Sequence, residues 1–122
     1  MSQILIAEDE VRIAAFIEKG LQRHGYSTVV AKDGIEAIEM LREDKFDLLL
    51  LDLGLPGKDG WVVLQELRTQ ISPDLDVIIV TARDDVADRV KGGQFGVQGH
   101  IIKPFKFNDL LERVKLRLNM KD

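Results

Sequence analysis

A chain of 122 residues, of which 45% are hydrophobic and 31% charged, is long enough to bury one core, and we expect a single domain over residues 1–122. The net charge of −4 argues against direct binding of nucleic acid, and the lack of cysteine excludes disulfides and thiolate metal sites. No stretch approaches the ~20 apolar residues of a membrane span, and the first residues leave no room for a signal peptide, so we expect a cytoplasmic protein without membrane contact.

Short apolar runs alternate along the chain with segments of helical periodicity. The runs are continuous, which is typical of parallel strands that are buried on both faces. The predicted strands span residues 4–7, 27–31, 48–51, 77–80 and 101–102. Apolar residues three or four positions apart predict a helix after each strand. These residues are Ile13, Ile17 and Leu21; Ala37, Ile38 and Leu41; Leu64, Leu67 and Ile71; Val86 and Val90; and Phe107, Leu110, Leu111, Val114 and Leu118.

The first three predicted helices have residues at their ends that typically cap or stop a helix. Gly25 follows the first helix, Asp33 can cap the second, and Pro73 stops the third. The fourth helix is weaker because Gly92 and Gly93 interrupt its apolar stripe. Each helical glycine costs about 1 kcal/mol relative to alanine. We therefore expect the fourth helix to be short or mobile.

Five strand–helix units with parallel strands require right-handed crossovers, which place helices on both faces of the sheet. We expect an α/β fold of the flavodoxin-like, doubly wound (βα)5 type, a sandwich around a five-stranded parallel sheet in the order 2-1-3-4-5. Ligands of such sheets bind at the carboxyl ends of the strands, where the strand order reverses. This point lies between the first and third predicted strands.

Polar residues follow four of the predicted strands. Glu8 and Asp9 follow the first, Asp52 the third, Thr81 the fourth and Lys103 the fifth. Three carboxylates and one ammonium leave excess negative charge, which a hard cation such as Mg²⁺ compensates while bridging to phosphate. Carboxylates also act as nucleophiles that form aspartyl-phosphates. Asp52 would then attack phosphorus while Lys103 and Mg²⁺ neutralise the transferring oxygens and Thr81 donates its hydroxyl.

These residues lie in motifs that resemble those of response-regulator receiver domains of two-component signalling, and in particular of the OmpR/PhoB type. The motifs are Ile4-Leu5-Ile6-Ala7-Glu8-Asp9-Glu10, Leu51-Asp52-Leu53-Gly54-Leu55-Pro56-Gly57-Lys58-Asp59-Gly60, Val80-Thr81-Ala82-Arg83-Asp84 and Lys103-Pro104-Phe105. Any one of them is a weak signal, but four in order at these spacings are specific. The resemblance covers essentially the whole chain.

The resemblance implies a role for each residue of the acidic site. Asp52 would accept a phosphoryl group from a sensor histidine kinase, a phosphotransfer protein or acetyl phosphate. Asp9, Asp52 and the backbone carbonyl of Gly54 would bind Mg²⁺, with Glu8 acting through water. Lys103 would pair with the phosphoryl group. The domain would be a switch that phosphorylates and dephosphorylates itself, and not a turnover enzyme.

The resemblance also implies a relay away from the site. Thr81 matches the switch hydroxyl, and the peptide bond before Pro104 is expected to be cis. His100 stands where the family usually has a tyrosine or phenylalanine as the switch ring, so the output would depend on pH near 6.5. An ordinary edge-strand histidine without a switching role is an equally supported reading.

Two positions bear on the lifetime of the acyl phosphate. Gly54 and Arg83, each two residues after a site residue, flank the path of the hydrolytic water in this family. Gly54 offers no side chain there, whereas Arg83 would partly shield the site. These effects act in opposite directions.

The output surface departs from the family pattern. In the OmpR/PhoB type the fourth helix, fifth strand and fifth helix form a homodimer face, and charges bridge it. Gln98-Gly99 replaces the acidic pair of that face, while Arg89, Lys91 and Arg113 keep its basic side. Dimerisation driven by phosphorylation is therefore in question. The resemblance further implies a DNA-binding output domain after residue 122, unless the protein is a single-domain regulator.

Three other functions fit parts of the pattern. A degenerate receiver would be an interaction module that works without phosphorylation, and the altered face around 92–100 keeps this alternative open. A phosphatase with an aspartate nucleophile would carry a second aspartate where Gly54 stands. A flavin-binding domain of the same fold is disfavoured because Glu8 and Asp9 would repel the flavin phosphate.

Overall fold

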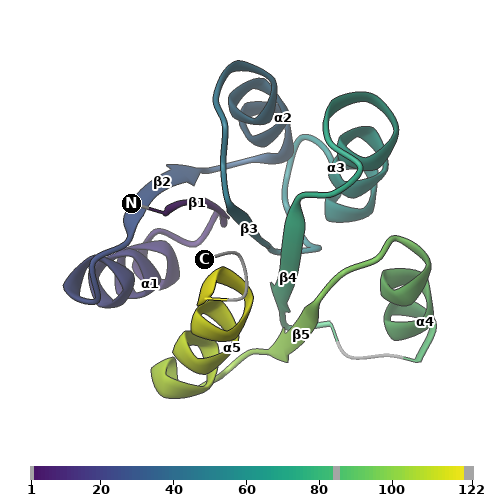
Figure 1. Ribbon diagram of the computed structural model, residues 1–122. Coiled ribbons are helices and arrows are strands. Elements are labelled where there is room, and N and C mark those ends of the chain that lie inside the picture. The colour runs from purple at the N-terminus through teal and green to yellow at the C-terminus, as the bar shows by residue number, and fades with distance from the viewer. Residues whose placement is uncertain (1, 84–85, 120–122) are drawn as a thin grey trace.

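The computed structural model of the protein describes residues 2–83 and 86–119, in which strands and helices alternate (Figure 1). A short π-helical segment, η1, extends the third helix. The elements are β1 (Gln3–Ala7), α1 (Val11–Arg23), β2 (Ser27–Ala31), α2 (Gly34–Glu43), β3 (Leu48–Leu51), α3 (Gly60–Glu66), η1 (Leu67–Ile71), β4 (Asp76–Thr81), α4 (Val86–Gln94), β5 (Gly99–Ile102) and α5 (Phe107–Asn119). All five predicted strands are confirmed, with β1, β4 and β5 slightly longer than expected.

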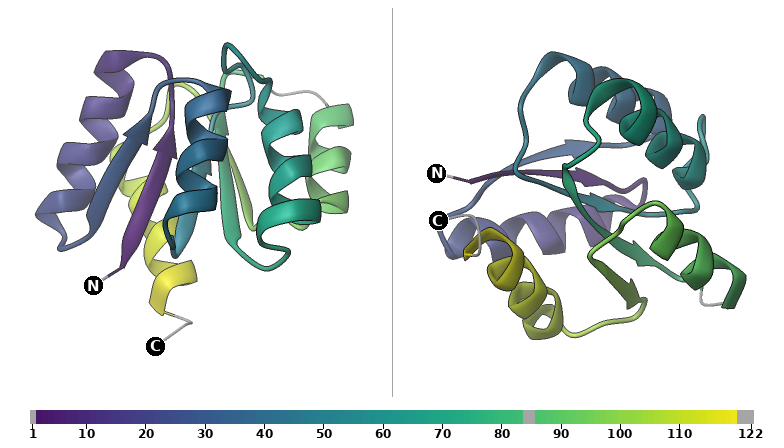
Figure 2. Two further views of the ribbon diagram at one scale, coloured as in Figure 1. Left: turned by 90° about the horizontal axis from the view of Figure 1, so that it is seen from above. Right: turned by 45° about the vertical axis from the view of Figure 1, so that its right-hand side comes forward.

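The strands form one parallel sheet in the order β2-β1-β3-β4-β5. Helices α1 and α5 cover one face of the sheet, and α2, α3 and α4 cover the other (Figures 1 and 2). The predicted flavodoxin-like fold is therefore confirmed. No helix within the described ranges is long and apolar enough to cross a membrane.

The central strand β3 shows why the apolar runs are continuous. Leu49 and Leu51 pack with α2 and α3 in one core cluster, while Leu48 and Leu50 pack with α1 and α5 in the other. All four leucines are buried, with at most 2% of their surface exposed. Burial on both faces fixes the position of β3. Because Asp52 directly follows β3, its backbone is fixed as well.

The predicted helix ends are also confirmed. The side chain of Asp33 accepts a hydrogen bond from the backbone N–H of Glu36 at 2.7 Å, which caps α2. Gly25, directly after the C-cap of α1, has a φ of 87°, in the left-handed region that glycine adopts without strain. The π-helical turn ends at Ile71, two residues before Pro73.

The fourth helix differs from its predicted pattern. At 9 residues α4 is shorter than the 13-residue α1 and α5, as expected, while its mobility stays a prediction. Val90 was wrongly placed on the buried face, because 58% of its surface is exposed. Asp88 and Gly92 are buried instead. The side chain of Val86, also assigned to that stripe, lies outside the described residues.

Candidate functional site

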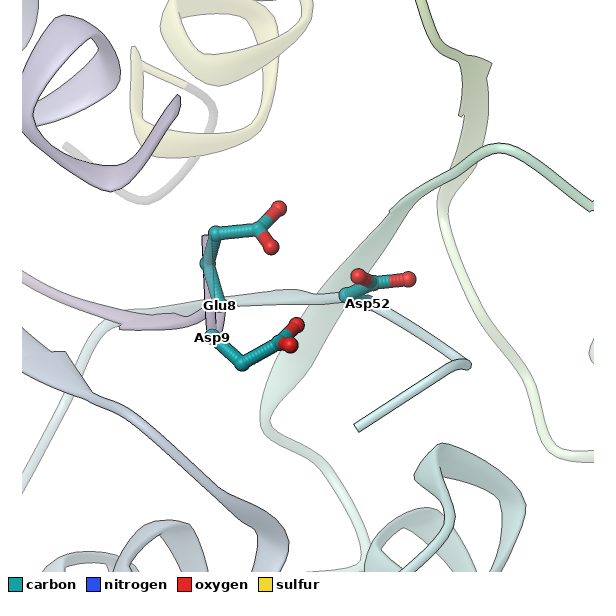
Figure 3. A group of neighbouring side chains, drawn as sticks. All are labelled: Glu8, Asp9 and Asp52. Atoms are coloured by element: carbon teal, nitrogen blue, oxygen red, sulfur yellow. The ribbon is translucent and has the colours of Figure 1, made fainter. Parts of the chain in front are cut away.

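Three carboxylates meet where two neighbouring strands end. Ala7 and Leu51 are register partners of β1 and β3, and the backbone N–H of Asp52 continues the ladder by donating to the carbonyl of Ala7 at 3.1 Å. Glu8, Asp9 and Asp52 follow directly, and one oxygen of each carboxylate lies within 4.8 Å of the others (Figure 3). The sheet register therefore creates the acidic cluster that the sequence predicted.

The cluster is buried at one end and open at the other. Glu8 and Asp52 are 3% and 7% exposed, whereas Asp9 is exposed. Gly54 lies in the turn after Asp52 and donates its backbone N–H to Oδ1 of Asp52 at 3.1 Å, which fixes the orientation of that carboxylate. Solvent and small ions can therefore approach the cluster from the side of Asp9.

Lys103 supplies the positive charge. Its ammonium lies 2.6 Å from Oε1 of Glu8 and 3.1 Å from Oδ2 of Asp52. The backbone N–H of Lys103 donates to the carbonyl of Thr81 at 2.9 Å, which continues the pairing of β4 and β5 by one residue. The peptide bond between Lys103 and Pro104 is cis.

Burial and charge shift the pKa values within the cluster. Burial raises the pKa of the Glu8 carboxyl, and the hydrogen bonds from Lys103 and from the N–H of Glu10 do not offset this effect. Burial by itself would lower the pKa of Lys103, but its hydrogen bonds to Glu8 and Asp52 outweigh burial and raise it. The lysine therefore stays charged, and the carboxylates still exceed it in charge.

The donor set suits a hard divalent cation. Carboxylate oxygens are the ligands that Mg²⁺ prefers, and Mg²⁺ keeps several waters and so favours a site open on one side. The carboxylates of Asp9 and Asp52 meet this requirement, while Glu8 is more deeply buried and pairs with Lys103. The excess negative charge of the cluster would be offset by such an ion.

Thr81 and His100 meet at a third residue, Arg83. Thr81 ends β4 and is 1% exposed, and its hydroxyl accepts the backbone N–H of Arg83 at 3.3 Å. Nε2 of His100 on β5 lies 3.4 Å from the carbonyl oxygen of Arg83. The structure thus brings Glu8, Asp9, Asp52 and Lys103 directly together, and it links Thr81 to His100 through the backbone of Arg83.

The side chain of Arg83 is held by two acidic residues. Its guanidinium binds Asp88 through two nitrogens, at 3.0 and 3.3 Å, and lies 3.4 Å from Asp59. These contacts attach it to α4 and to the residue that caps α3, and its shielding of the acyl phosphate stays a prediction. Sequence reasoning missed Asp88 because an acid on a helix is ordinarily a solvated charge. The one available signal was that Gly92 and Gly93 interrupt the apolar stripe predicted for the fourth helix.

Comparison with known proteins gives consistent matches. The model of the response regulator receiver domain family matches residues 4–115. The transcriptional activator protein IrlR of Burkholderia pseudomallei is 42% identical over 113 residues, which make up 93% of this chain but 48% of that protein. The chain therefore spans about half the length of the curated relatives that it matches.

Two solved structures cover nearly the whole chain. The receiver domain of the Francisella response regulator 1452 is 30% identical and superposes with a TM-score of 0.92 over 100% of both chains. The response regulator protein TrrA of Thermotoga maritima, in complex with Mg²⁺ and BeF, is 30% identical, with a TM-score of 0.86 over 96% of this chain and 99% of that one.

Proposed function

Because this chain belongs to the response regulator receiver domain family, we propose that it accepts a phosphoryl group on Asp52 in a Mg²⁺-dependent reaction. The observation that carries the proposal is the position of the Asp52 carboxylate. It lies 3.1 Å from the ammonium of Lys103 and within 4.8 Å of the carboxylates of Glu8 and Asp9. A nucleophile, a counter-charge and a set of oxygen ligands therefore lie at one strand end.

The residues of the site divide the chemistry between them. A carboxylate oxygen of Asp52 attacks phosphorus, and the bond from phosphorus to the donor breaks as the acyl phosphate forms. Lys103 shifts its hydrogen bonds toward the transferred oxygens and neutralises part of their charge. Asp9, Asp52 and the carbonyl of Gly54 would hold Mg²⁺, with Glu8 behind them. The bound ion would supply further positive charge at the transferring oxygens.

Support for the metal comes from the charge of the site and from a similar structure. The cluster holds more carboxylates than cations, and burial raises the pKa of Glu8, so the site is electrostatically unfavourable without a further positive charge. The similar TrrA structure is a complex with Mg²⁺ and BeF. The donor of the phosphoryl group would be a sensor histidine kinase, a phosphotransfer protein or acetyl phosphate.

The output would be a change of surface. After phosphorylation the hydroxyl of Thr81 would turn toward the phosphoryl group, and the ring of His100 would follow it on the α4-β5-α5 face. The domain would thus be a cytoplasmic switch and not a turnover enzyme. The similarity to transcriptional activator IrlR, and the half of that protein that this chain does not span, support an OmpR/PhoB-type regulator with a DNA-binding output domain.

Homodimerisation through the α4-β5-α5 face has weaker support. Gln98 stands where the OmpR/PhoB type carries an acid, and its side-chain carbonyl accepts the backbone N–H of Val77 at 2.7 Å. The backbone N–H of Gln98 also donates to the carbonyl of Val77, at 2.8 Å. Gln98 is thus used within the sheet edge, so any dimer would need different charge pairs.

The phosphoryl-acceptor role is tested by intact mass after incubation with acetyl phosphate and Mg²⁺. The wild type should gain one phosphoryl adduct, which is lost in Asp52→Asn and when Mg²⁺ is chelated. Asp44→Asn changes an exposed aspartate after α2 and should behave as the wild type. No adduct on the wild type, together with no change in Trp61 fluorescence on adding beryllofluoride, would instead favour an interaction module that works without phosphorylation.

A further inference from the structure

Arg83 connects four parts of the domain. Its backbone N–H donates to the hydroxyl of Thr81, and its carbonyl lies 3.4 Å from Nε2 of His100. Its guanidinium binds Asp88 on α4 and reaches Asp59, which caps α3, at 3.4 Å. The proposed switch hydroxyl, the proposed switch ring and two helices are therefore joined through one residue.

Asp88 is the buried end of this connection. Only 4% of its surface is exposed, and its Oδ1 accepts both Nε1 of Trp61 and a guanidinium nitrogen of Arg83, each at 3.0 Å. Burial would raise the pKa of this carboxyl, but the hydrogen bonds from Trp61 and Arg83 outweigh burial and lower it. A carboxylate this deep needs such donors, because an unpaired buried charge is strongly unfavourable.

Further contacts attach α4 to the third helix along its length. The ammonium of Lys91 lies 5.1 Å from the centre of the Trp61 ring, in cation–π geometry. The ring of Phe95, directly after α4, stacks on Trp61 with centroids 6.0 Å apart. Arg68 of η1 donates to the carbonyl of Phe95 at 2.8 Å, which satisfies the carboxyl end of α4. Trp61 is thus the centre of the contact between α3 and α4.

We propose that Trp61, Asp88 and Arg83 form a latch that holds α4 against α3 in the unphosphorylated domain and opens when a phosphoryl group occupies Asp52. The inference rests on the proposed function of Asp52. It concerns a device that connects the site to the output surface.

The coupling runs through the Arg83 backbone. When the Thr81 hydroxyl turns toward a phosphoryl oxygen, the N–H of Arg83 loses its acceptor, and the peptide that carries the guanidinium shifts. A bidentate pair between a guanidinium and a carboxylate depends on alignment, so a small shift weakens both hydrogen bonds. The Asp88 carboxylate then loses the guanidinium that offsets its charge, which favours its movement toward solvent, and α4 moves with it as one element. By reciprocity, weakening the latch must favour occupation of the phosphoryl site.

The single tryptophan gives a direct readout of the latch. Trp61 has the one indole N–H of the chain, and that group donates to Asp88. Adding Mg²⁺ and beryllofluoride to the ¹⁵N-labelled chain should move the indole signal and speed its exchange with solvent by roughly tenfold, because the hydrogen bond opens. The ¹⁹F signal of bound fluoride reports occupation of Asp52 independently. An unchanged indole signal at full ¹⁹F occupancy would overturn the latch.

Variants of the latch give a second test through affinity. Asp88→Asn removes the buried charge, and Arg83→Gln removes its partner from a side chain that is 43% exposed, so the fold tolerates the second change even if it does not tolerate the first. Both should bind beryllofluoride about tenfold more tightly than the wild type. Asp44→Asn, with the same charge change far from α4, should not.

The outcomes separate the two proposals. Wild-type affinity in both latch variants, with bound ¹⁹F signal present, overturns the latch and leaves phosphoryl acceptance by Asp52 intact. No bound ¹⁹F signal in the wild type overturns the proposed function and the latch with it. A tighter site in both variants together with an exposed indole in the occupied wild type supports the latch.

Discussion

The ammonium of Lys103 lies 2.6 Å from a carboxylate oxygen of Glu8, and both side chains are nearly buried, with 11% and 3% of their surface exposed. The lysine proposed to meet the phosphoryl group is therefore already engaged with a second acid. This arrangement keeps the ammonium charged and close to Asp52, which lies 3.1 Å away. It also leaves the site with unbalanced negative charge, so the site is less stable by itself than with a cation present.

Replacing Lys103 should destabilise the domain, because it removes the positive charge that offsets part of the negative charge of the cluster. We expect Lys103→Met to lower the free energy of unfolding by about 1–3 kcal/mol at pH 7, because it leaves Oε1 of the buried Glu8 carboxylate without the ammonium that pairs with it. Urea unfolding measures the effect. Lys106→Met removes the same charge from an exposed side chain and should change stability by less than about 0.5 kcal/mol. Equal effects of the two changes would mean that the ion pair with Glu8 contributes nothing.

Magnesium should stabilise the fold through Asp9. In EDTA the free energy of unfolding of Asp9→Asn should lie within about 0.5 kcal/mol of the wild-type value, because this carboxylate is exposed. At Mg²⁺ concentrations about 100 times the dissociation constant, the wild type should gain roughly 2.7 kcal/mol, while Asp9→Asn should gain far less at the same concentration. Glu10→Gln, an exposed neighbour, is the control. A similar gain for Asp9→Asn would remove this residue from the metal site.

The sequence predicts this fold well because the signal is local. Runs such as Leu48–Leu51 identify strands buried on both faces, and polar residues directly after them must meet at the carboxyl edge of a parallel sheet. The latch is different, because it depends on how α4 is rotated against α3. Asp88 looks like a solvated helix charge until the positions of Trp61 and Arg83 are known. The error at Val90 has the same origin, since buried polar pairs replaced the apolar contact that the periodicity implied.

The latch should respond to pH only under acidic conditions. The folded pKa of Asp88 lies below the ordinary 3.8, so its stabilising contribution is fully present above 3.8 and is lost as the pH falls through the folded value. We expect the indole N–H resonance of Trp61 to stay fixed from pH 7 to about 4 and to move only below 3.8. The cost of Asp88→Asn, about 1–3 kcal/mol at pH 7, should shrink over the same acidic range. Movement of the indole signal near pH 6 in His100→Phe, where no imidazole faces Arg83, would contradict the low pKa.

Replacing glycine with alanine should destabilise the domain at Gly60 and stabilise it at Gly93. A Cβ added at Gly60, the first residue of α3, would lie 2.5 Å from the Cα of Leu53 and 2.7 Å from the carbonyl oxygen of Asp52. Because these are backbone atoms at the site, we expect Gly60→Ala to destabilise the domain by about 1–3 kcal/mol or more. It should also reduce phosphoryl acceptance, since the chain around Asp52 must shift.

Gly93 of α4 is the matched position, because a Cβ there meets nothing within 4 Å. Gly93→Ala should stabilise the domain by about 0.5–1 kcal/mol, the difference in helix propensity between the two residues. Urea unfolding of both variants measures the pair. Amide exchange adds a local test, because a mobile α4 should exchange faster than α5 in the wild type and gain protection in Gly93→Ala. Equal protection of α4 and α5 in the wild type would show that the contacts with Trp61 and Arg68 already hold α4 as firmly as the core holds α5.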